Sequence, residues 1–267
     1  MRTTSTHLQR VWDAVCTRDD RPTTVGRGPA STSLLQKQYE RKLKAIAKYI
    51  GKMVDKWDLD FDSLPTLTRL LRDYAAALRP WAAKVGKQMI KGVDDKERAS
   101  WRALGNAISQ QVHRELHATP VGERAKGFLA EQVDLITSLP TRAAERVHQL
   151  TVKALETGTR AREIAQEIQR QGEVSESQAI LIARTEVGRT QSALLQARCE
   201  EINVTHYIWR TANDSDVRPG HKAMAGKVCA WADPPAVDEN GRIMYHHPGE
   251  IWNCRCYAEP IIPSIDA

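Results

Sequence analysis

The stretch LLQKQYERKLKAIAKYIGKMVDKW, residues 34–57, indicates the fold of the first half of the chain. Apolar side chains recur in it at three- and four-residue steps, the period of an α-helix with one buried side. These side chains are Leu35, Tyr39, Leu43, Ile46, Ile50, Val54 and Trp57. The stretch therefore predicts a long amphipathic helix that packs along one side.

The other side of this predicted helix is strongly basic. The basic residues are Lys37, Arg41, Lys42, Lys44, Lys48, Lys52 and Lys56, against only Glu40 and Asp55. Lysine is common on solvated helix faces, so simple exposure is one interpretation. The other is a surface that binds DNA phosphates or an acidic protein, formed by Lys37, Arg41, Lys44, Lys48 and Lys52. Binding to DNA through phosphates would be independent of sequence and sensitive to salt.

The chain divides into three regions by composition. Residues 1–32 are rich in Arg, Asp, Thr, Gly and Pro and predict a flexible N-terminal arm, with a short helix around 11–15. Residues 33–158 predict a helical region, with breaks at Pro65, Pro80, Pro120, Pro140 and Gly158. Residues 159–267 predict a separate domain, in which the helical period ends near 201 and short strands follow near 204–209, 242–245 and 256–258. We expect a mainly α N-terminal region and a smaller α+β, loop-rich C-terminal domain.

Composition excludes several classes of protein. The chain has 267 residues and a mean hydropathy of -0.50, and its apolar runs are far shorter than the roughly 20 residues that cross a bilayer. We expect no transmembrane helix, and the N-terminus lacks the apolar segment of a secretory signal. The cysteines are Cys16, Cys199, Cys229, Cys254 and Cys256, an odd set that indicates reduced thiols or a metal site. A net charge of +6 permits a polyanionic partner without requiring one.

The last third of the chain carries an ordered run of motifs. They are Arg184-Thr185-Glu186, Trp209, Asp214-x-Asp216-x-Arg218-x-x-His221, Gly226, His246-His247-Pro248-Gly249 and Asn253-Cys254-Arg255-Cys256. Arg184 and Glu186 are two residues apart on a predicted helix, so they do not face each other. We expect each to reach into the loop-rich tail; the alternative is a pair of exposed helix charges. Asp214-Ser215-Asp216 predicts an Asx turn that presents the residues after it.

Cys254 and Cys256 place two thiols on one short segment, where they can bind a soft cation such as Zn²⁺ together with further Cys or His ligands. The candidate ligands are His221, His247, Cys254 and Cys256, with His246 and Cys229 also available. Two alternatives stay open. The cysteines can instead pack as buried, reduced apolar side chains under Trp252. A metal-dependent nuclease could use the histidines with Asp214 and Asp216, although their spacing matches no recognisable nuclease motif.

Taken together, the motifs resemble the C-terminal domain of the phage Mu F-like head morphogenesis, or minor capsid, proteins. The resemblance covers roughly residues 160–260 and agrees in motif order and spacing. It implies a structural signature formed by Arg184, Glu186, Trp209, Asp216, Arg218, His221, Gly226, Asn253 and Arg255. Cys229 departs from the family pattern, in which an aromatic or aliphatic residue is commoner, and this keeps open a metal role particular to this chain.

The resemblance also implies a function. It describes a virion component of a tailed bacteriophage, located inside the head near the portal and in the host cytoplasm during assembly. The expected partner is the portal protein, with major capsid or scaffold protein and phage DNA as further candidates and no membrane. The expected role is procapsid assembly, with DNA packaging or delivery as an extension, and no catalytic residue is implied. The alternative class is an enzyme, either a metal-dependent nuclease or a toxin-like effector that acts on nucleic acid.

Overall fold

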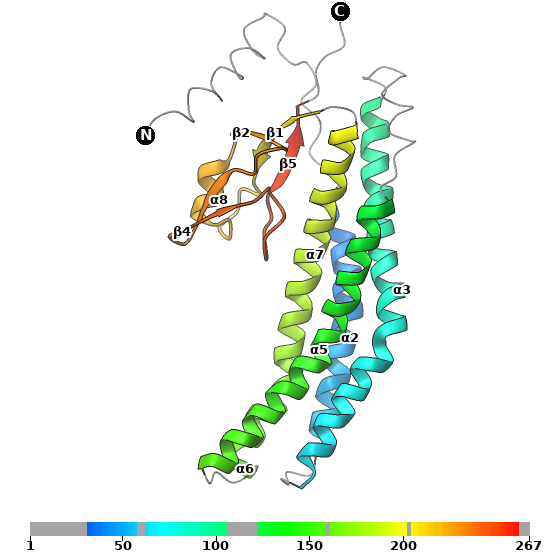
Figure 1. Ribbon diagram of the computed structural model, residues 1–267, viewed down its shortest axis with the longest axis vertical. Helices are drawn as coiled ribbons and strands as arrows, with labels where there is room; N and C mark the ends of the chain where they lie inside the picture. The colour runs from blue at the N-terminus through cyan, green and yellow to red at the C-terminus, as the bar shows by residue number, and fades with distance from the viewer. Residues whose placement is uncertain (1–30, 58–61, 106–121, 158–160, 202–203, 262–267) are drawn as a thin grey trace, which may run out of the picture. The chain divides into compact units, whose positions relative to one another are not determined.

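The computed structural model describes residues 31–57, 62–105, 122–157, 161–201 and 204–261 (Figure 1). Its helices are α2 (Ser33–Asp55), α3 (Leu64–Gly105), α5 (Gly122–Thr157), α6 (Ala161–Gln169), α7 (Gln171–Glu201) and α8 (Pro219–Met224). Its strands are β1 (His206–Arg210), β2 (Val228–Ala230), β3 (Ala236–Glu239), β4 (Arg242–Tyr245) and β5 (Tyr257–Pro260). Long helices followed by small antiparallel strands and loops confirm the predicted fold class. The predicted arm and the breaks at Pro120 and Gly158 lie outside the described residues.

The described residues form two compact units, each built from separate stretches of chain. The bundle unit takes in Thr32–Gly92 and Ala125–Val187, and the tail unit takes in the described parts of Val93–Arg124 and Gly188–Ala267. Helices α3, α5 and α7 contribute residues to both units. These units group residues by contact in space, so the three-region division by composition stays a prediction.

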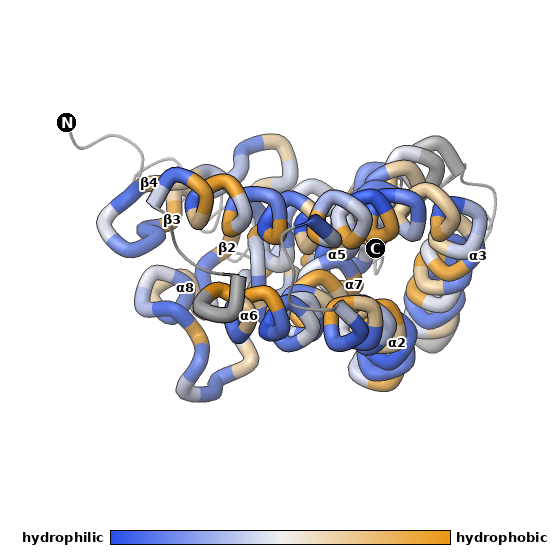
Figure 2. The backbone as a smooth tube through the Cα atoms, turned by 90° about the horizontal axis from the view of Figure 1, so that it is seen from below, coloured by the Kyte–Doolittle hydropathy of each residue, from blue (hydrophilic) through white to orange (hydrophobic). Residues whose placement is uncertain are grey.

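The bundle unit consists of helices that run alongside one another (Figure 1). The buried side of α2 is the predicted apolar stripe, since Tyr39, Leu43, Ile46, Ala47, Ile50 and Val54 are all buried. Helices α2, α3 and α5 carry their apolar residues mainly on one side, and Figure 2 shows the helices almost end-on with each residue coloured by hydropathy. Burial of one Leu or Ile side chain contributes roughly 1.5–3 kcal/mol, so this stripe is a main source of stability for the unit.

Two predicted helix breaks are wrong. Helix α3 continues through Pro80, and α5 continues through Pro140. A proline inside a helix costs about 3 kcal/mol because it removes a backbone donor and crowds the preceding turn. Buried residues lie on the same helix face before and after each proline. They are Leu78 and Ala82 in α3, and Leu139 and Ala143 in α5. Burial on both sides therefore offsets the local cost and keeps each helix continuous. The predicted break at Pro65 is confirmed, since α3 begins at Leu64.

The tail unit contains two small antiparallel sheets. Strands pair in the order β2-β1-β5 in the first sheet, and β3 pairs with β4 in the second. The β3–β4 hairpin turns at Asn240 and Gly241, whose φ angles of 57° and 88° are those of a two-residue hairpin turn with both φ positive. The strands predicted near 204–209, 242–245 and 256–258 correspond to β1, β4 and β5, whereas β2 and β3 were not predicted.

The core of the tail unit surrounds β1. Tyr207 and Trp209 are fully buried and belong to one apolar cluster that includes residues of α3, α7, α8, β2, β3 and β5. Its other members are Trp101, Leu195, Cys199, Val204, Val217, Met224, Cys229, Trp231, Val237, Cys254, Cys256 and Ala258. Across the described residues, no helix is both long enough and apolar enough to span a membrane.

Candidate functional site

A buried cluster of one histidine and two cysteines lies in the tail unit. His221 is on the short helix α8, and Cys254 and Cys256 are in the segment just before β5. Nδ1 of His221 lies 3.2 Å from Sγ of Cys256 and 3.5 Å from Sγ of Cys254. All three side chains are buried, with exposed fractions of 2%, 6% and 7% for His221, Cys254 and Cys256. The fold thus brings together three of the four predicted metal ligands.

Glu239, at the end of β3, holds the far side of His221. Its Oε1 lies 2.5 Å from Nε2 of His221 and 3.2 Å from Nε2 of His246. Arg218 approaches the other oxygen, with Nε 3.5 Å from Oε2. Trp209 stands edge-on to His221, with ring centroids 5.6 Å apart and an interplanar angle of 88°. One carboxylate therefore fixes two imidazole rings beside the central tryptophan.

The cluster favours a negative charge on one sulfur. The pKa of the Cys254 thiol is lowered, chiefly because its sulfur accepts a hydrogen bond from Cys256 and also one from His221. The pKa of the Cys256 thiol is raised, because its hydrogen bond to Cys254 and its burial both favour the neutral form. Burial alone would lower the pKa of His221, but the hydrogen bonds to Cys254 and Glu239 outweigh it, so the pKa of His221 is raised.

His247, the fourth predicted ligand, lies elsewhere in the core. Its Nδ1 is 2.9 Å from the hydroxyl of Tyr207, and burial lowers the pKa of its imidazole. Among the described residues, the groups of three side chains able to hold a metal ion are His221–Cys254–Cys256 and His221–Glu239–His246, and His247 is in neither. Cys229 is buried in β2, where burial raises the pKa of its thiol to about 11. The assignment of His247 and Cys229 as ligands therefore stays a prediction, because neither side chain belongs to one of these two groups.

Several signature residues brace the loops of the tail unit. Nη2 of Arg255 lies 2.6 Å from Asp214 and 3.0 Å from Asp216. The backbone N–H of Asp216 donates to Oδ1 of Asp214 at 3.2 Å, which confirms the predicted Asx turn. Arg218 donates from Nη2 to the carbonyl of Trp252 at 2.7 Å. The two aspartates of the nuclease interpretation are thus paired with arginine rather than grouped with the histidines.

Two further signature positions have backbone conformations with positive φ. Gly226 has φ of 81°, and its N–H donates to the carbonyl of Trp209 at 2.8 Å. Asn253 has φ of 58°, a left-handed conformation that asparagine tolerates better than most residues. The first closes the turn between α8 and β2, and the second turns the chain into the Cys254–Cys256 segment.

Arg184 and Glu186 belong to the bundle unit. Glu186 is fully buried and accepts a hydrogen bond from Nε2 of Gln132 at 2.6 Å. Gln132 in turn accepts a hydrogen bond from the hydroxyl of Tyr39 at 2.7 Å. This chain of bonds joins α2, α5 and α7. The interpretation of Glu186 as an exposed helix charge is therefore wrong, because burial beside an amide donor gives it a structural role.

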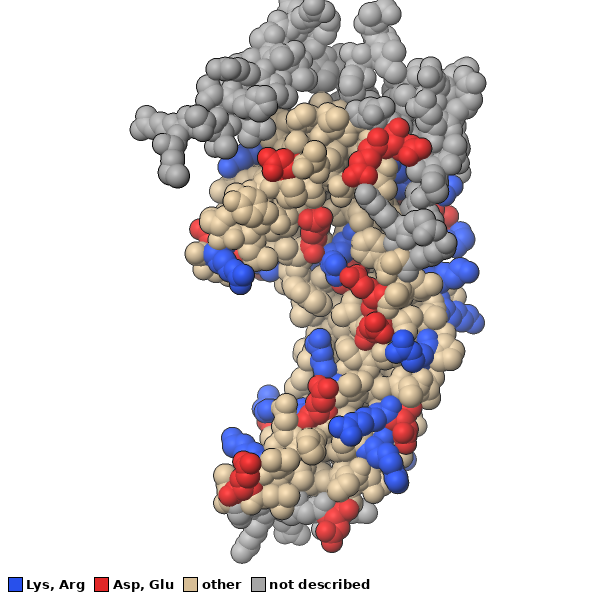
Figure 3. Space-filling model, viewed as in Figure 1, with Lys and Arg blue, Asp and Glu red and all other residues tan. Residues whose placement is uncertain are grey.

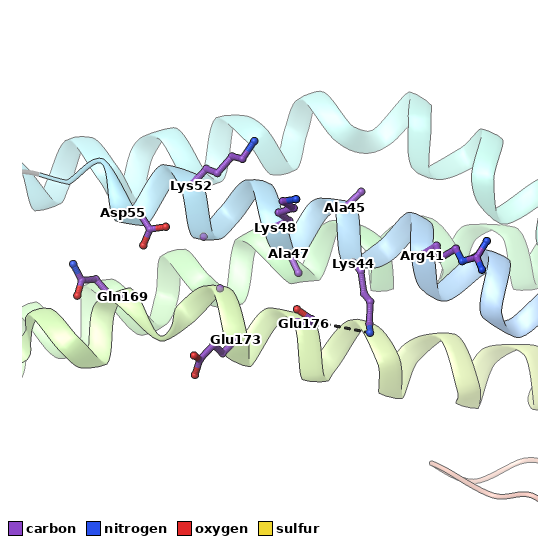
Figure 4. Close-up of a pocket in the computed structure, with 12 residues that line it drawn as sticks. Arg41, Lys44, Ala45, Ala47, Lys48, Lys52, Asp55, Gln169, Glu173 and Glu176 are labelled. Carbon is purple, nitrogen blue, oxygen red and sulfur yellow. Dashed lines mark ion pairs between the residues drawn. The ribbon is translucent and has the colours of Figure 1, made fainter.

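Four of the five residues of the predicted basic surface line a groove in the bundle unit, and Lys37 is not among its lining residues (Figure 4). The groove has a volume of about 790 Å³ between α2 and the adjoining ends of α6 and α7. Its basic lining residues are Arg41, Lys44, Lys48 and Lys52 of α2. Its acidic lining residues are Asp55 of α2 and Glu173 and Glu176 of α7. Lys44 forms ion pairs with Glu40 and Glu176, each at 3.2 Å, and these hydrogen bonds raise its pKa, that to Glu176 most. The face of the molecule drawn in Figure 3 likewise mixes both signs of charge. The groove therefore presents mixed rather than purely positive charge.

Two residues of the site carried no recognised signal in the sequence. Glu239 is a single glutamate between the polar residues Asp238 and Asn240, and Gly220 is one glycine in a loop-rich segment. The pair Asn240-Gly241 between alternating residues is a hairpin signal that would have placed Glu239 at the end of a strand. Nothing in the sequence places Glu239 next to His221, because that contact depends on how α8 packs against β3.

The fold and the site define a class of protein. It is a bundle of long helices joined to a small antiparallel domain that contains a buried cysteine–histidine cluster. Residues 145–259 match the family model described as Phage Mu protein F like protein. This match confirms the predicted resemblance of the C-terminal motifs.

Two relatives are similar to part of the chain. An uncharacterised protein of Haemophilus influenzae is 30% identical over 160 residues, which is 60% of this chain and 34% of that protein. The NAD(+)–arginine ADP-ribosyltransferase EFV of Enterococcus faecalis is 32% identical over 130 residues, 46% of this chain and 26% of that enzyme. The chain thus spans about a third or less of the curated relatives it matches. No solved structure matches it.

Proposed function

We propose that this protein is a minor head protein of a tailed bacteriophage and acts in head morphogenesis. The observation that carries the proposal is the match of residues 145–259 to the Phage Mu F-like family. The signature residues support it, since Trp209 and His221 are buried in the core of one compact unit and Arg218 and Arg255 brace its loops. A domain braced in this way suits docking and assembly better than turnover of a substrate.

Within the head, the proposed place is the portal vertex, on the inner side of the procapsid. The groove of the bundle unit is the proposed docking surface, and its mixed lining supports a folded protein as partner. Three acidic residues accompany four basic ones there, so a polyanion such as DNA would meet repulsion as well as attraction. A protein surface can instead offer charges of both signs in matching positions. The portal protein is the proposed occupant, and DNA contact is a secondary role during packaging or delivery.

The test is co-expression of the full chain with the portal protein encoded by the same phage, followed by affinity capture through the portal. We expect capture of the wild-type protein and its presence in purified procapsids and heads. The variant Lys48→Glu/Lys52→Glu should lose capture, because it turns one side of the groove acidic. The control Lys87→Glu/Lys153→Glu changes the same net charge at exposed positions outside the groove lining and should be captured normally. Absence of the wild-type protein from both portal complexes and heads would overturn the proposal.

The second candidate function is an enzyme acting on nucleic acid. The group His221–Glu239–His246 favours it, because two imidazoles and a carboxylate are ligands used by metal-dependent hydrolases. An enzyme of this kind should cleave DNA in Mg²⁺, Mn²⁺ or Zn²⁺, and His221→Ala or His246→Ala should abolish cleavage. Purified protein without cleavage in any of these metals would reject this candidate. The same result would leave the head-protein proposal standing.

A further inference from the structure

We propose that Nδ1 of His221, Sγ of Cys254 and Sγ of Cys256 bind one Zn²⁺ ion as three of its four tetrahedral ligands, and that this ion joins the segment before β5 to α8. The proposal does not depend on the function of the protein in the phage head. It rests on the positions of the donor atoms, on the groups that hold the other side of His221, and on the N–H groups that face the sulfurs.

The spacing of the donor atoms fits a zinc site. With Zn–N near 2.0–2.1 Å and Zn–S near 2.3 Å, a tetrahedral site separates nitrogen and sulfur ligands by about 3.6 Å. The distances from His221 Nδ1 are 3.2 Å to Cys256 and 3.5 Å to Cys254. All three donor atoms lie within 4.8 Å of one another. Small adjustments of side chains would therefore place one ion among them.

Glu239 selects the nitrogen of His221 that faces the sulfurs. Its carboxylate accepts the Nε2–H of His221 at 2.5 Å, so the proton that His221 releases when a metal binds comes from Nδ1, whose lone pair then faces the ion. A carboxylate on the second nitrogen of a metal-binding histidine is a common supporting contact that orients the ring and strengthens the ligand. The 2.5 Å distance also favours His221–Cys254–Cys256 over His221–Glu239–His246 as the group that holds the ion. Two ligands of one zinc ion through nitrogen and oxygen would lie about 3.4 Å apart, so Glu239 and His221 form a hydrogen bond instead.

Donors around the sulfurs complete the site. The backbone N–H groups of Gly249 and Cys256 each donate to Sγ of Cys254 at 3.4 Å. Such N–H groups stabilise a thiolate, which is the form of cysteine that binds a metal. The indole of Trp209 is buried, and its hydrogen bond to the Cys256 thiol acts to lower the pKa of that thiol, which favours the thiolate. Trp209 also lies edge-on to the His221 ring, so one indole contacts both the histidine and a cysteine of the site.

The chemistry and the connectivity indicate zinc in a structural role. Two thiolates and one imidazole are soft or intermediate donors, which suit Zn²⁺ and not Mg²⁺ or Ca²⁺. The ligand pairs are 33 and 35 residues apart in the chain, so an ion would close a long loop within a unit that has only small sheets. Cross-links that close long loops restrict the unfolded chain most. Binding of the ion should therefore appear directly as stability of the tail unit.

The test uses the full chain, expressed with zinc and purified without chelator under reducing conditions. Elemental analysis should find about one zinc per chain, as a single mononuclear site requires. Cys254→Ser, Cys256→Ser and His221→Asn should each lose the metal. Cys229→Ser and His247→Asn are matched controls in the same core and should keep it. Glu239→Gln should still bind zinc, with affinity about 10–100-fold weaker.

A second measurement needs no variant and covers the case in which a substituted chain fails to fold. Metal-free wild-type protein, checked for helix content by circular dichroism, is titrated with Co²⁺ and then alkylated. Binding should give thiolate-to-cobalt charge-transfer absorption and protect Cys254 and Cys256 from alkylation beyond the protection seen without metal. Lack of stoichiometric zinc together with lack of this absorption would overturn the proposal. Loss of metal in Cys229→Ser equal to that in Cys254→Ser would overturn the ligand set.

Discussion

Gly220 lies directly against the backbone of Asp238: a Cβ atom at Gly220 would be 1.9 Å from the carbonyl oxygen of Asp238. Gly220 is the second residue of α8, and Asp238 is in β3, so this contact sets the distance between the helix and the hairpin. The residues that follow each of them are His221 and Glu239, which meet at 2.5 Å. A glycine with no side chain therefore permits the contact on which the cysteine–histidine cluster depends.

Gly220→Ala should destabilise the tail unit by about 1–3 kcal/mol, the usual cost of forcing an extra carbon into a packed site. The clash is with backbone, so no side chain can move aside. Urea unfolding followed by tryptophan fluorescence measures the loss, because Trp209 and Trp231 are buried in this unit.

Gly127→Ala is the matched control for this substitution. A Cβ atom there meets no heavy atom within 4 Å, and the residue is inside α5. Removing a glycine from a helix should raise stability by roughly 0.5–1 kcal/mol. Equal effects of the two substitutions would contradict the packing of α8 on β3.

Gln132→Leu should destabilise the bundle unit by about 2–3 kcal/mol, because buried polar groups that lose a partner pay their desolvation cost. Gln132 serves both Tyr39 and the buried Glu186. The exposed pair between Gln88 and Lys42 provides the comparison, and Gln88→Leu should change stability by less than about 0.5 kcal/mol. Chemical denaturation of both variants, monitored by circular dichroism, decides the point; a Gln132→Leu variant as stable as wild type would show that the chain of bonds contributes nothing.

Glu97 should make the stability of the tail unit depend on pH. Burial raises the pKa of Glu97 above its ordinary value of 4.5, although the hydrogen bond from Gln191 and the nearby Arg198 act in the opposite direction. The folded protein then holds the Glu97 proton more tightly than the unfolded chain. This contribution to stability is complete below pH 4.5 and is lost as the pH rises through the raised pKa.

Glu97→Gln keeps a neutral side chain at all pH values, so it removes this dependence. Its stability relative to wild type should increase from pH 4.5 to pH 7, measured by thermal unfolding across that range. Glu145→Gln, at an exposed position of α5, should give a difference that does not vary with pH in this way. A constant difference for Glu97→Gln would mean that burial does not govern this carboxyl.

DNA binding by α2, if it contributes to packaging, should be weak and steeply dependent on salt. Each phosphate neutralised adds about 0.9 to the slope of log affinity against log salt concentration. Arg41→Ala/Lys48→Ala/Lys52→Ala should therefore reduce the slope by up to about 2.7, at three phosphates lost. Fluorescence anisotropy with duplexes of unrelated sequence measures it. A salt-independent affinity, or a slope unaffected by the triple variant, rejects phosphate contact along this helix.

Much of the helical part was predictable because its determinants are local. The spacing of Leu43, Ile46 and Ile50 already specifies which side of α2 is buried. Pro80 and Pro140 were misread, since a proline lowers the helix preference of its own turn while burial of residues on both sides acts over the whole helix. Strand β2 was missed because three residues carry too short a pattern to be distinguished from a loop.

The candidate site was only partly predictable. Cys254, Cys256 and His221 stood out by residue type, which limits a metal site to a few side chains. His246 and His247 are neighbours of the same type, and the sequence offered no means to separate them. In the fold, His246 shares a carboxylate with His221, while His247 bonds to Tyr207. Successive side chains in an extended segment point to opposite sides, so their partners depend on what packs against each side.

By itself, the sequence determined the amphipathic helices, the change to a loop-rich tail and the family of its C-terminal motifs, because periodicity and motif order are properties of the chain. The tertiary structure alone decided that Glu186 is buried against Gln132 and that Glu239 holds His221 beside the two cysteines. Those contacts join residues far apart in the chain or on different elements. Their formation depends on the packing of whole helices and strands, and on a glycine at residue 220 that lets α8 reach β3.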